Sequence, residues 1–213
     1  MHSAARLGRW VGATACLLQA VPVAAFTATI SAGSPRTIYL QVGVGSFAGG
    51  NYNSGGTPVA NPTVNRVSVT VPAAALGNST AQAMATNTGA TSSFYDGFAF
   101  CNANQLYVGG FYRFTSNASG AAATLTANSS VPLNNGSGGT IPFTQIRWTS
   151  SGNGDTGAQP FPAGTFTGSA SQLIGTIARN RWSESCLSFS YLNTTIPPAG
   201  TYTGTVTYTL SAP

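Results

Sequence analysis

Few side chains in this 213-residue chain could do chemistry. Its acidic residues are Asp96, Asp155 and Glu184, its one histidine is His2, and it has no lysine. Catalytic triads, cysteine–histidine pairs and imidazole zinc sites require histidine, and Schiff-base chemistry requires lysine. Two carboxylates can hydrolyse a glycoside, but with three acids in all a working pair would arise only by chance. We therefore expect no enzyme, no catalytic or metal-binding residue and no cofactor.

The N-terminus has the pattern of a secretory signal peptide over residues 1–25. Arg6 and Arg9 supply the positive region, Trp10–Ala25 is apolar and uncharged, and small residues end the segment. The apolar stretch is shorter than the about 20 residues of a comfortable membrane span, and no other segment approaches that length. We therefore expect an exported protein of residues 26–213 that has lost its histidine and is not embedded in a membrane.

Two cysteines, Cys101 and Cys186, remain after the signal peptide, and the third lies within it. An even number of cysteines in an exported chain favours a disulfide, here between Cys101 and Cys186. This bridge would close a loop of about 85 residues and add roughly 4 kcal/mol of stability in the chain-entropy model. The alternative is a pair of buried free thiols.

Charged residues are scarce. Once the signal peptide is removed, six arginines stand against three acidic residues, and the arginines are dispersed along the chain. Nucleic-acid binding requires a dense basic footprint, so we expect no nucleic-acid partner. A weakly charged surface rich in Thr, Ser, Asn and Gly suits an exterior protein that packs against copies of itself.

Alternation with a period of two residues predicts β-strands along most of the chain. Early strands are expected over Phe26–Ala32, Thr37–Val44 and Asn65–Val71, with a long loop rich in Gly, Asn and Pro over Ser46–Thr63. One short, Ala-rich helix is expected within Pro72–Thr86. The later strands are expected over Ser93–Cys101, Gln105–Phe114, Ala123–Val131, Ile141–Ser150, Thr165–Leu173, Ser185–Asn193 and Thr201–Leu210.

Aromatic residues are concentrated in the middle of the chain. We expect them to pack in the core with their apolar neighbours, and the alternative is a surface that stacks on carbohydrate. Many short strands with frequent turns and no paired helices indicate an antiparallel β-sandwich or barrel. The core candidates in this region are Phe98, Phe100, Leu106, Val108, Phe111 and Phe114.

The last predicted strand, Thr201–Leu210, alternates strictly between threonine and mainly apolar residues, so one face suits water and the other a core. The segment "AGTYTGTVTYTLS" resembles the C-terminal strand of chaperone-usher pilus subunits, particularly the archaic branch that includes spore coat protein U-like domains. Gly200 is the fourteenth residue from the end, where classical pilins carry a glycine. The remainder resembles this family in kind, with a signal peptide, an alternating N-terminal segment and a β-rich body.

The resemblance implies an immunoglobulin-like sandwich, residues 37–213, that lacks its final strand. A groove beside the last strand is then filled in trans, first by a periplasmic chaperone and later, at an outer-membrane usher, by the N-terminal extension of a neighbouring subunit. The extension would be residues 26–36, with Phe26, Ala28, Ile30 and Ala32 as donor side chains. The groove wall would consist of the residues of the last strand that face inward, with Gly204 leaving room: Gly200, Tyr202, Gly204, Val206, Tyr208 and Leu210.

The function that the resemblance implies is a structural or tip subunit of a surface fimbria, used for adhesion or biofilm formation. Such a subunit passes through the periplasm to the cell surface. The alternative is a secreted, self-contained β-sandwich that binds a ligand such as a glycan. A subunit completed by strand donation should be unstable or polymerise when alone, whereas a complete sandwich should be a stable monomer.

Overall fold

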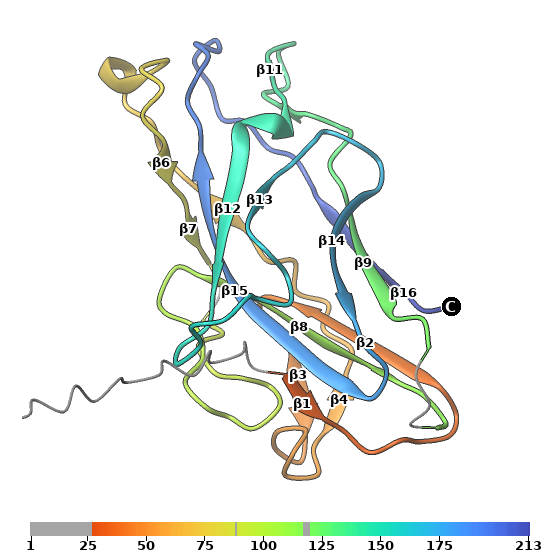
Figure 1. The fold of residues 1–213 in the computed structure, drawn as a ribbon. Coiled ribbons are helices and arrows are strands. Elements are labelled where there is room, and N and C mark those ends of the chain that lie inside the picture. Colours follow the sequence, from red (N-terminus) through yellow and green to blue (C-terminus); the bar gives the residue numbers. More distant parts are fainter. Residues whose placement is uncertain (1–26, 88, 117–119) are drawn as a thin grey trace, which may run out of the picture.

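A computed structural model describes residues 27–87, 89–116 and 120–213, and the fold of these residues is all-β. Two antiparallel sheets lie face to face with apolar side chains between them (Figure 1). The antiparallel β-sandwich expected from the sequence is therefore confirmed. The expected signal peptide, residues 1–25, lies outside the described residues. No helix formed by the described residues has the length and apolar character needed to cross a membrane.

The larger sheet has seven strands, and β15, Arg181–Tyr191, lies at its centre. Five of its strands lie in the order β13-β12-β15-β8-β2, and β1 and β6 pair with the two ends of β15. β1 pairs with the part of β15 that already contacts β8, so β1 must lie on the other side, in line with β12. The bounds of these strands are β1 Thr27–Thr29, β2 Thr37–Val42, β6 Gln82–Ala83, β8 Leu106–Arg113, β12 Ile146–Ser151 and β13 Gly164–Thr165.

The smaller sheet has three strands in the order β14-β9-β16. Its strands are β9, Ala123–Asn128, β14, Gln172–Ile177, and β16, Thr207–Ser211. All of its pairings are antiparallel, and the C-terminus of the chain follows directly after β16 (Figure 1). β16 is thus an edge strand of this sheet.

The core between the sheets follows from alternation in the sequence. In β9 the buried residues Ala123, Leu125 and Ala127 alternate with exposed or half-buried polar residues. In β12 the buried residues Ile146 and Trp148 alternate with polar residues in the same way. One face of each strand therefore supplies the core, and the other face meets solvent.

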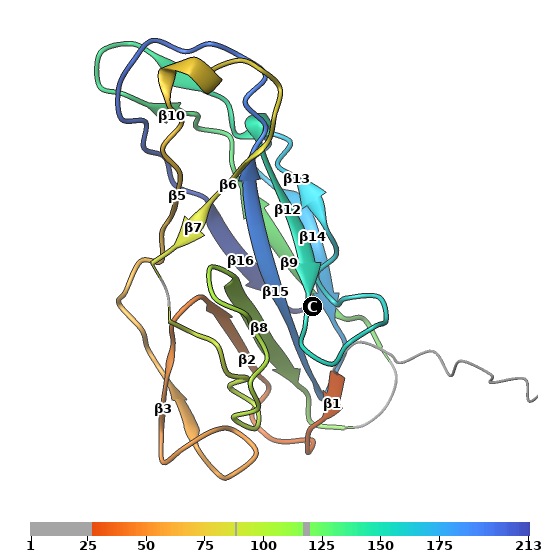
Figure 2. The same ribbon diagram turned by 90° about the vertical axis from the view of Figure 1, so that its left-hand side faces the viewer.

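A further layer covers the outer face of the larger sheet. The chain between β2 and β8 crosses this face in short elements, so most of β15 is buried on both sides (Figure 2). These elements are β3 Ser46–Ala48, β4 Thr57–Val59, β5 Val67–Ser68 and β7 Ala85–Thr86. The 3₁₀ turn η1, Ala73–Ala75, lies at the end of the sandwich, beyond β15 (Figure 1). At the far end of the sandwich lie β10 Leu133–Asn134, β11 Thr140–Ile141 and η2 Phe143–Gln145.

The helix expected within Pro72–Thr86 is wrong. Only Ala73–Ala75 form a 3₁₀ turn; a turn follows directly after it, and the later part of the segment includes β6 and β7. Asn193, far along the chain, stabilises this turn. Its Oδ1 accepts a hydrogen bond from the Gly77 amide at 3.0 Å, and its Nδ2 donates to the Ala75 carbonyl at 2.7 Å. A tertiary contact has overridden the helix propensity of alanine here.

Three smaller expectations also need correction. The loop expected over Ser46–Thr63 contains the β3–β4 hairpin. The strand expected over Ser93–Cys101 is irregular and forms only the isolated bridge between Ser92 and Ala99. Phe98, expected in the core, is 60% exposed, because this irregular segment does not keep the side-chain alternation of a strand.

Candidate functional site

The C-terminal strand has the two faces that its sequence predicts. Thr207 and Thr209 are exposed, Tyr208 is half-buried and Leu210 is 8% exposed. Val206, which directly precedes β16, also packs against the core between the sheets. Burial raises the pKa of the Tyr208 hydroxyl, so this side chain stays neutral. The regular strand is shorter than expected, but the inward set is on the expected face.

The glycine at position 204 leaves room, as its sequence context suggests. A Cβ at Gly204 would lie 3.0 Å from Cγ of Leu133 and 3.1 Å from Cζ of Phe143, so a larger residue would press on both side chains. Tyr202 is half-buried, and its hydroxyl donates to the backbone carbonyl four residues earlier at 2.7 Å. Gly200 is exposed in the turn that precedes this segment. These residues extend the predicted wall beyond β16.

β2 and β16 are neighbouring edge strands that belong to different sheets. Among the described residues β2 pairs only with β8 and β16 only with β9, although β2 and β16 contact each other (Figure 2). We call their two unpaired edges the open seam. Ile38 on β2 is 46% exposed there. Half-buried side chains from both strands pack against the core beside the seam, namely Leu40, Val42, Val206 and Tyr208.

The candidate donor segment lies on its own chain in this structure. β1 pairs with β15 over three residue pairs, with Ala28 opposite Trp182. Ala28 and Ala32 are half-buried, and Ile30 is 5% exposed. Phe26 lies outside the described residues. The structure therefore does not bring the donor candidates to the open seam of the same chain.

Ile30 belongs to an aromatic cluster on the outer face of the larger sheet. It packs with Phe111 and Trp182, whose ring centroids are 5.7 Å apart. Tyr52 covers the same spot, with ring centroids 5.1 Å from Phe111 and 5.3 Å from Trp182. Offset aromatic contacts at these distances stabilise a fold beyond their burial alone. The buried aromatic residues here serve packing, as expected.

The expected disulfide between Cys101 and Cys186 is confirmed, with the two Cα atoms 5.5 Å apart. Both residues are buried, and they pack with Phe100 and Tyr107 in a second small cluster. The bridge ties the central strand β15 to the chain just before β8. It therefore fixes the outer layer to the sheet that the layer covers.

Glu184 is a buried acid that sequence reasoning did not single out as a site. Its side chain is 0% exposed, and Oε2 accepts hydrogen bonds from Ser93 Oγ at 2.9 Å, Trp182 Nε1 at 2.9 Å and the Tyr107 hydroxyl. Oε1 has no hydrogen-bond partner among the described residues. Desolvation by burial raises the pKa of the Glu184 carboxyl, although the three donors oppose that shift. The only signal in the sequence is an acid directly before a segment expected to form a strand.

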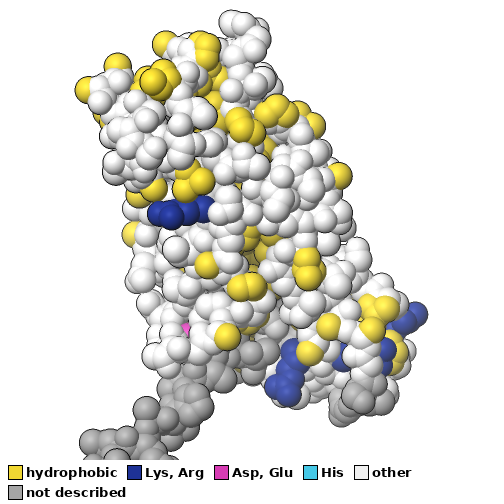
Figure 3. All heavy atoms as spheres, turned by 45° about the horizontal axis from the view of Figure 1, so that its top comes forward, with side chains coloured by type: hydrophobic (Ala, Val, Ile, Leu, Met, Phe, Trp, Pro, Cys, Tyr) yellow, Lys and Arg dark blue, Asp and Glu magenta, His cyan; other side chains and the backbone are white. Residues whose placement is uncertain are grey.

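The described residues contain no group of three or more His, Cys, Asp or Glu side chains that could hold a metal ion. The surface in Figure 3 is mostly uncharged, with scattered apolar side chains and few arginines. Oδ1 of Asp96 accepts a hydrogen bond from the Phe98 amide at 2.9 Å, a contact within a local turn. Most of the arginine side chains on view lie toward one end of the molecule (Figure 3). Arg36 and Arg179 both lie over the Phe114 ring.

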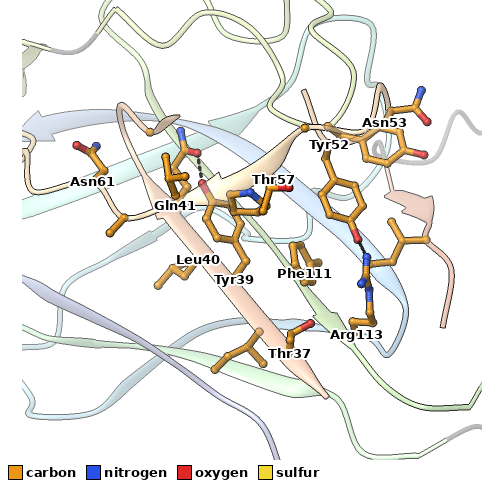
Figure 4. Close-up of a pocket in the computed structure, with 18 of the residues that line it drawn as sticks. Thr37, Tyr39, Leu40, Gln41, Tyr52, Asn53, Thr57, Asn61, Phe111 and Arg113 are labelled. Carbon is orange, nitrogen blue, oxygen red and sulfur yellow. Dashed lines mark hydrogen bonds between the residues drawn. The ribbon is translucent and has the colours of Figure 1, made fainter. Parts of the chain in front are cut away.

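A groove opens between β2 and the hairpin β3–β4, on the outer side of the larger sheet. Its volume is about 960 Å³. Figure 4 shows Tyr39, Gln41 and Phe111 along its floor, with Tyr52 and Thr57 on the opposite side. Sequence reasoning missed this groove because its wall is the hairpin within the segment expected to be a loop.

No family model matches this chain, and the comparisons with curated proteins and with solved structures found no match.

Proposed function

We propose that the protein is a subunit of a surface fibre that is assembled by strand addition between neighbouring copies. The observation that carries the proposal is the open seam: two adjacent edge strands from different sheets, with half-buried apolar side chains beside them. A sandwich edge of this kind offers unpaired backbone donors and acceptors together with pockets for alternate side chains. The resemblance of the last strand to pilus subunits, made on the sequence alone, points to the same edge.

An incoming strand at the seam would do two things. Its backbone would pair with β16, and its alternate side chains would cover the half-buried residues, among them Leu40, Val206 and Tyr208. Burial of apolar surface contributes about 25 cal/mol per Å², so covering several such side chains stabilises the subunit substantially. In this proposal a periplasmic chaperone supplies the strand first, and a neighbouring subunit replaces it at the usher.

The donor in this proposal is the N-terminal segment, residues 26–32. It alternates apolar and polar residues and is uncharged, which suits an apolar groove. In the single chain β1 pairs with β15 over only three residue pairs, so donation requires the loss of a short pairing and of the contacts of Ile30. The pairing of β1 with β15 of the same chain then competes with donation of the segment to a neighbour.

The test adds the missing strand within one chain. A copy of residues 26–32 is attached after Pro213 through a flexible turn of about four residues, so that it can fold back along β16. We expect the melting temperature to rise by about 5–10 °C, since each kcal/mol shifts it by roughly 2–4 °C in a protein of this size. The measurement is thermal unfolding by circular dichroism.

The matched control carries Ile30→Asp in the appended copy only, which leaves β1 of the protein intact. An unpaired charge is costly in an apolar site, so the control should show no rise in melting temperature. Equal melting temperatures for the two extended proteins would show that the seam does not accept this strand in the proposed register.

A further inference from the structure

The groove between β2 and the β3–β4 hairpin has the size and shape of a binding site. Its volume of about 960 Å³ lies at the upper end of the range of natural ligand pockets. All six residues of β2 line it, and a six-residue strand spans roughly 20 Å. The facing wall is the continuous segment 55–61, which contains β4. The groove therefore suits a ligand that is long rather than compact.

The polar groups that line the groove are almost all uncharged hydroxyls and amides. None of the lining residues is acidic, so the groove lacks the carboxylates that hold hard cations. Thr37, Asn53 and Thr57 are exposed in it. A hydroxyl is donor and acceptor at once, and an amide side chain offers both kinds of atom. These groups match a ligand that itself carries many hydroxyls.

The one charged residue of the lining is already used by the protein. Nη2 of Arg113 donates to the Tyr52 hydroxyl, and the guanidinium carbon lies 5.7 Å from the Tyr52 ring centroid and 5.9 Å from that of Phe111. Burial also raises the pKa of Tyr39 to about 12, so its hydroxyl is neutral at physiological pH. The guanidinium is therefore held against Tyr52 and Phe111, and the other polar groups that line the groove are uncharged.

The groove also offers aromatic surface. Tyr39 and Tyr52 are half-buried and line it, and Phe111 lies beneath them (Figure 4). The Tyr39 and Phe111 rings are stacked with centroids 5.7 Å apart, which keeps their orientation fixed. Aromatic side chains combine an apolar face with a polar edge, and the apolar C–H face of a sugar ring packs on such a surface.

The walls of the groove are held in place by hydrogen bonds. The Tyr39 hydroxyl donates to Oε1 of Gln41 at 2.7 Å, and Nε2 of Gln41 donates to the Gly43 carbonyl at 2.8 Å. Asn61 and Asn65 donate through their side-chain amides to the carbonyls of Val44 and Val42 respectively. Asn65 thus ties the chain after β4 to the end of β2, and Asn61 ties it to the residues that follow β2. A site that is formed before the ligand arrives loses less conformational entropy on binding.

From this combination we propose that the groove binds a neutral, linear oligosaccharide. Its length, its hydroxyls and amides and its aromatic floor each match that class of ligand. The proposal goes beyond fibre assembly. The groove shares β2 with the open seam, but its other wall is the β3–β4 hairpin and it includes no residue of β16. A fibre subunit with this groove would carry a ligand site along the fibre.

The test uses three neutral tetrasaccharides as probes: cellotetraose, chitotetraose and maltotetraose. Each is titrated into the ¹⁵N-labelled protein, and amide chemical shifts report the place and the strength of binding. We expect at least one probe to bind with a dissociation constant of about 1 mM or tighter. The shifts should map to β2, to residues 51–61 and to the amides beside Tyr52 and Phe111.

Matched double variants locate the interaction. Asn53→Ala/Thr57→Ala removes two exposed side chains of the groove and should weaken binding about tenfold, the loss of roughly 1.4 kcal/mol. Asn102→Ala/Thr149→Ala removes two exposed side chains of the same types outside the groove and should bind as the wild type does. Far-UV circular dichroism confirms that both variants are folded.

Three outcomes would overturn the oligosaccharide site. These are the absence of shifts with all three probes, equal weakening in the two double variants, and shifts that map outside the groove. A fourth probe is a peptide of residues 27–32. Shifts of groove amides with this peptide would assign the groove to strand docking instead, whereas shifts along β16 would support fibre assembly and leave the sugar result to stand alone.

Discussion

At the scale of single residues, Glu184 shows how the fold determines the chemical state of a group. A carboxyl at 0% exposure is destabilised in its charged form, and only one of its two oxygens receives hydrogen bonds. Asp96 lies near enough to raise the Glu184 pKa further. The sequence could not reveal this, because the three donors come from segments up to 91 residues away. Local pattern reasoning sees an acid in a strand but not its surroundings.

Glu184 should make stability depend on pH. Its pKa is raised in the folded protein, so its contribution is fully present below the pKa of the unfolded chain and is lost as pH rises through the folded pKa. We expect the wild-type melting temperature to fall from about pH 4 to about pH 8 more steeply than that of Glu184→Gln. The glutamine oxygen can still accept from Tyr107 and Trp182. Thermal unfolding over this pH range measures the difference.

A second variant of this residue, Glu184→Ala, separates the effect of the charge from the effect of the hydrogen bonds. Glu184→Ala leaves buried donors of Ser93, Tyr107 and Trp182 without their acceptor, at roughly 1–3 kcal/mol each. It should therefore be less stable than the glutamine variant at every pH. Parallel pH profiles for wild type and Glu184→Gln would contradict the raised pKa.

The cysteines give a second prediction at the residue scale. Unreduced protein should contain no alkylatable thiol at Cys101 or Cys186, and mass spectrometry after iodoacetamide treatment measures this directly. Cys101→Ser/Cys186→Ser should lower the free energy of unfolding by roughly 4 kcal/mol, because the bridge closes a long loop of the unfolded chain. Two modified cysteines without reductant would contradict the bridge.

At the scale of elements, alternation in the sequence predicted the strands whose two faces meet different surroundings. β9, β12 and β16 each have one face on the core and one toward a more polar environment, and each was expected from its period-two pattern. β2 was expected in the same way, but its outer face is also covered, and its one fully buried residue is the polar Gln41. In β15, Leu187, Phe189 and Tyr191 alternate with serine, and this part was expected as a strand. Trp182–Glu184 are buried as well, and the sequence did not predict that the strand begins this early. The sheet order and the open seam depend on long-range pairings that no local pattern encodes.

The elements that sequence reasoning missed are held by side chains from distant segments. Asn61 and Asn65 fix the hairpin side of the groove to β2, and Asn193 shapes the turn at Ala73–Ala75. The composition of these segments, rich in Gly, Asn and Ala, predicts turns or helix equally well. Only tertiary hydrogen bonds decide between them, which is why the groove could not be predicted.

The last strand gives the prediction that belongs to this scale. Val206→Asp places a charge against the core at a cost of several kcal/mol, a large part of the about 5–15 kcal/mol that stabilises a domain. Thr207→Asp changes an exposed residue and should cost within about 0.5 kcal/mol. Levels of folded protein after expression should be near zero for Val206→Asp and close to wild type for Thr207→Asp. Equal loss, or the reverse order, would show that the inward face is assigned wrongly.

At the scale of the whole molecule, low charge and an open edge both favour association, by different mechanisms. The described residues include three acidic side chains and no lysine, so long-range repulsion between copies is weak. Weak repulsion permits any contact, whereas strand addition at the seam is specific to one edge and one donor. A single experiment can separate non-specific association from strand addition, because the donor segment, residues 26–32, has no charged side chain.

The purified protein should therefore form multimers that grow with time and concentration, while the protein with the appended copy of residues 26–32 should remain a monomer. The appended strand fills the seam of its own chain, so this protein can still donate β1 but can no longer accept a strand. Both proteins have the same charged residues, so association driven only by weak repulsion would be equal in the two. Size-exclusion chromatography with light scattering measures the masses, and electron microscopy distinguishes linear chains from irregular aggregates. Equal growth of the two proteins, or a wild type that stays monomeric at high concentration, would contradict assembly through the seam.

A mixture of the two proteins tests the same mechanism. A multimer end that has bound the protein with the appended strand presents no open seam, so adding more of that protein should shorten the wild-type multimers.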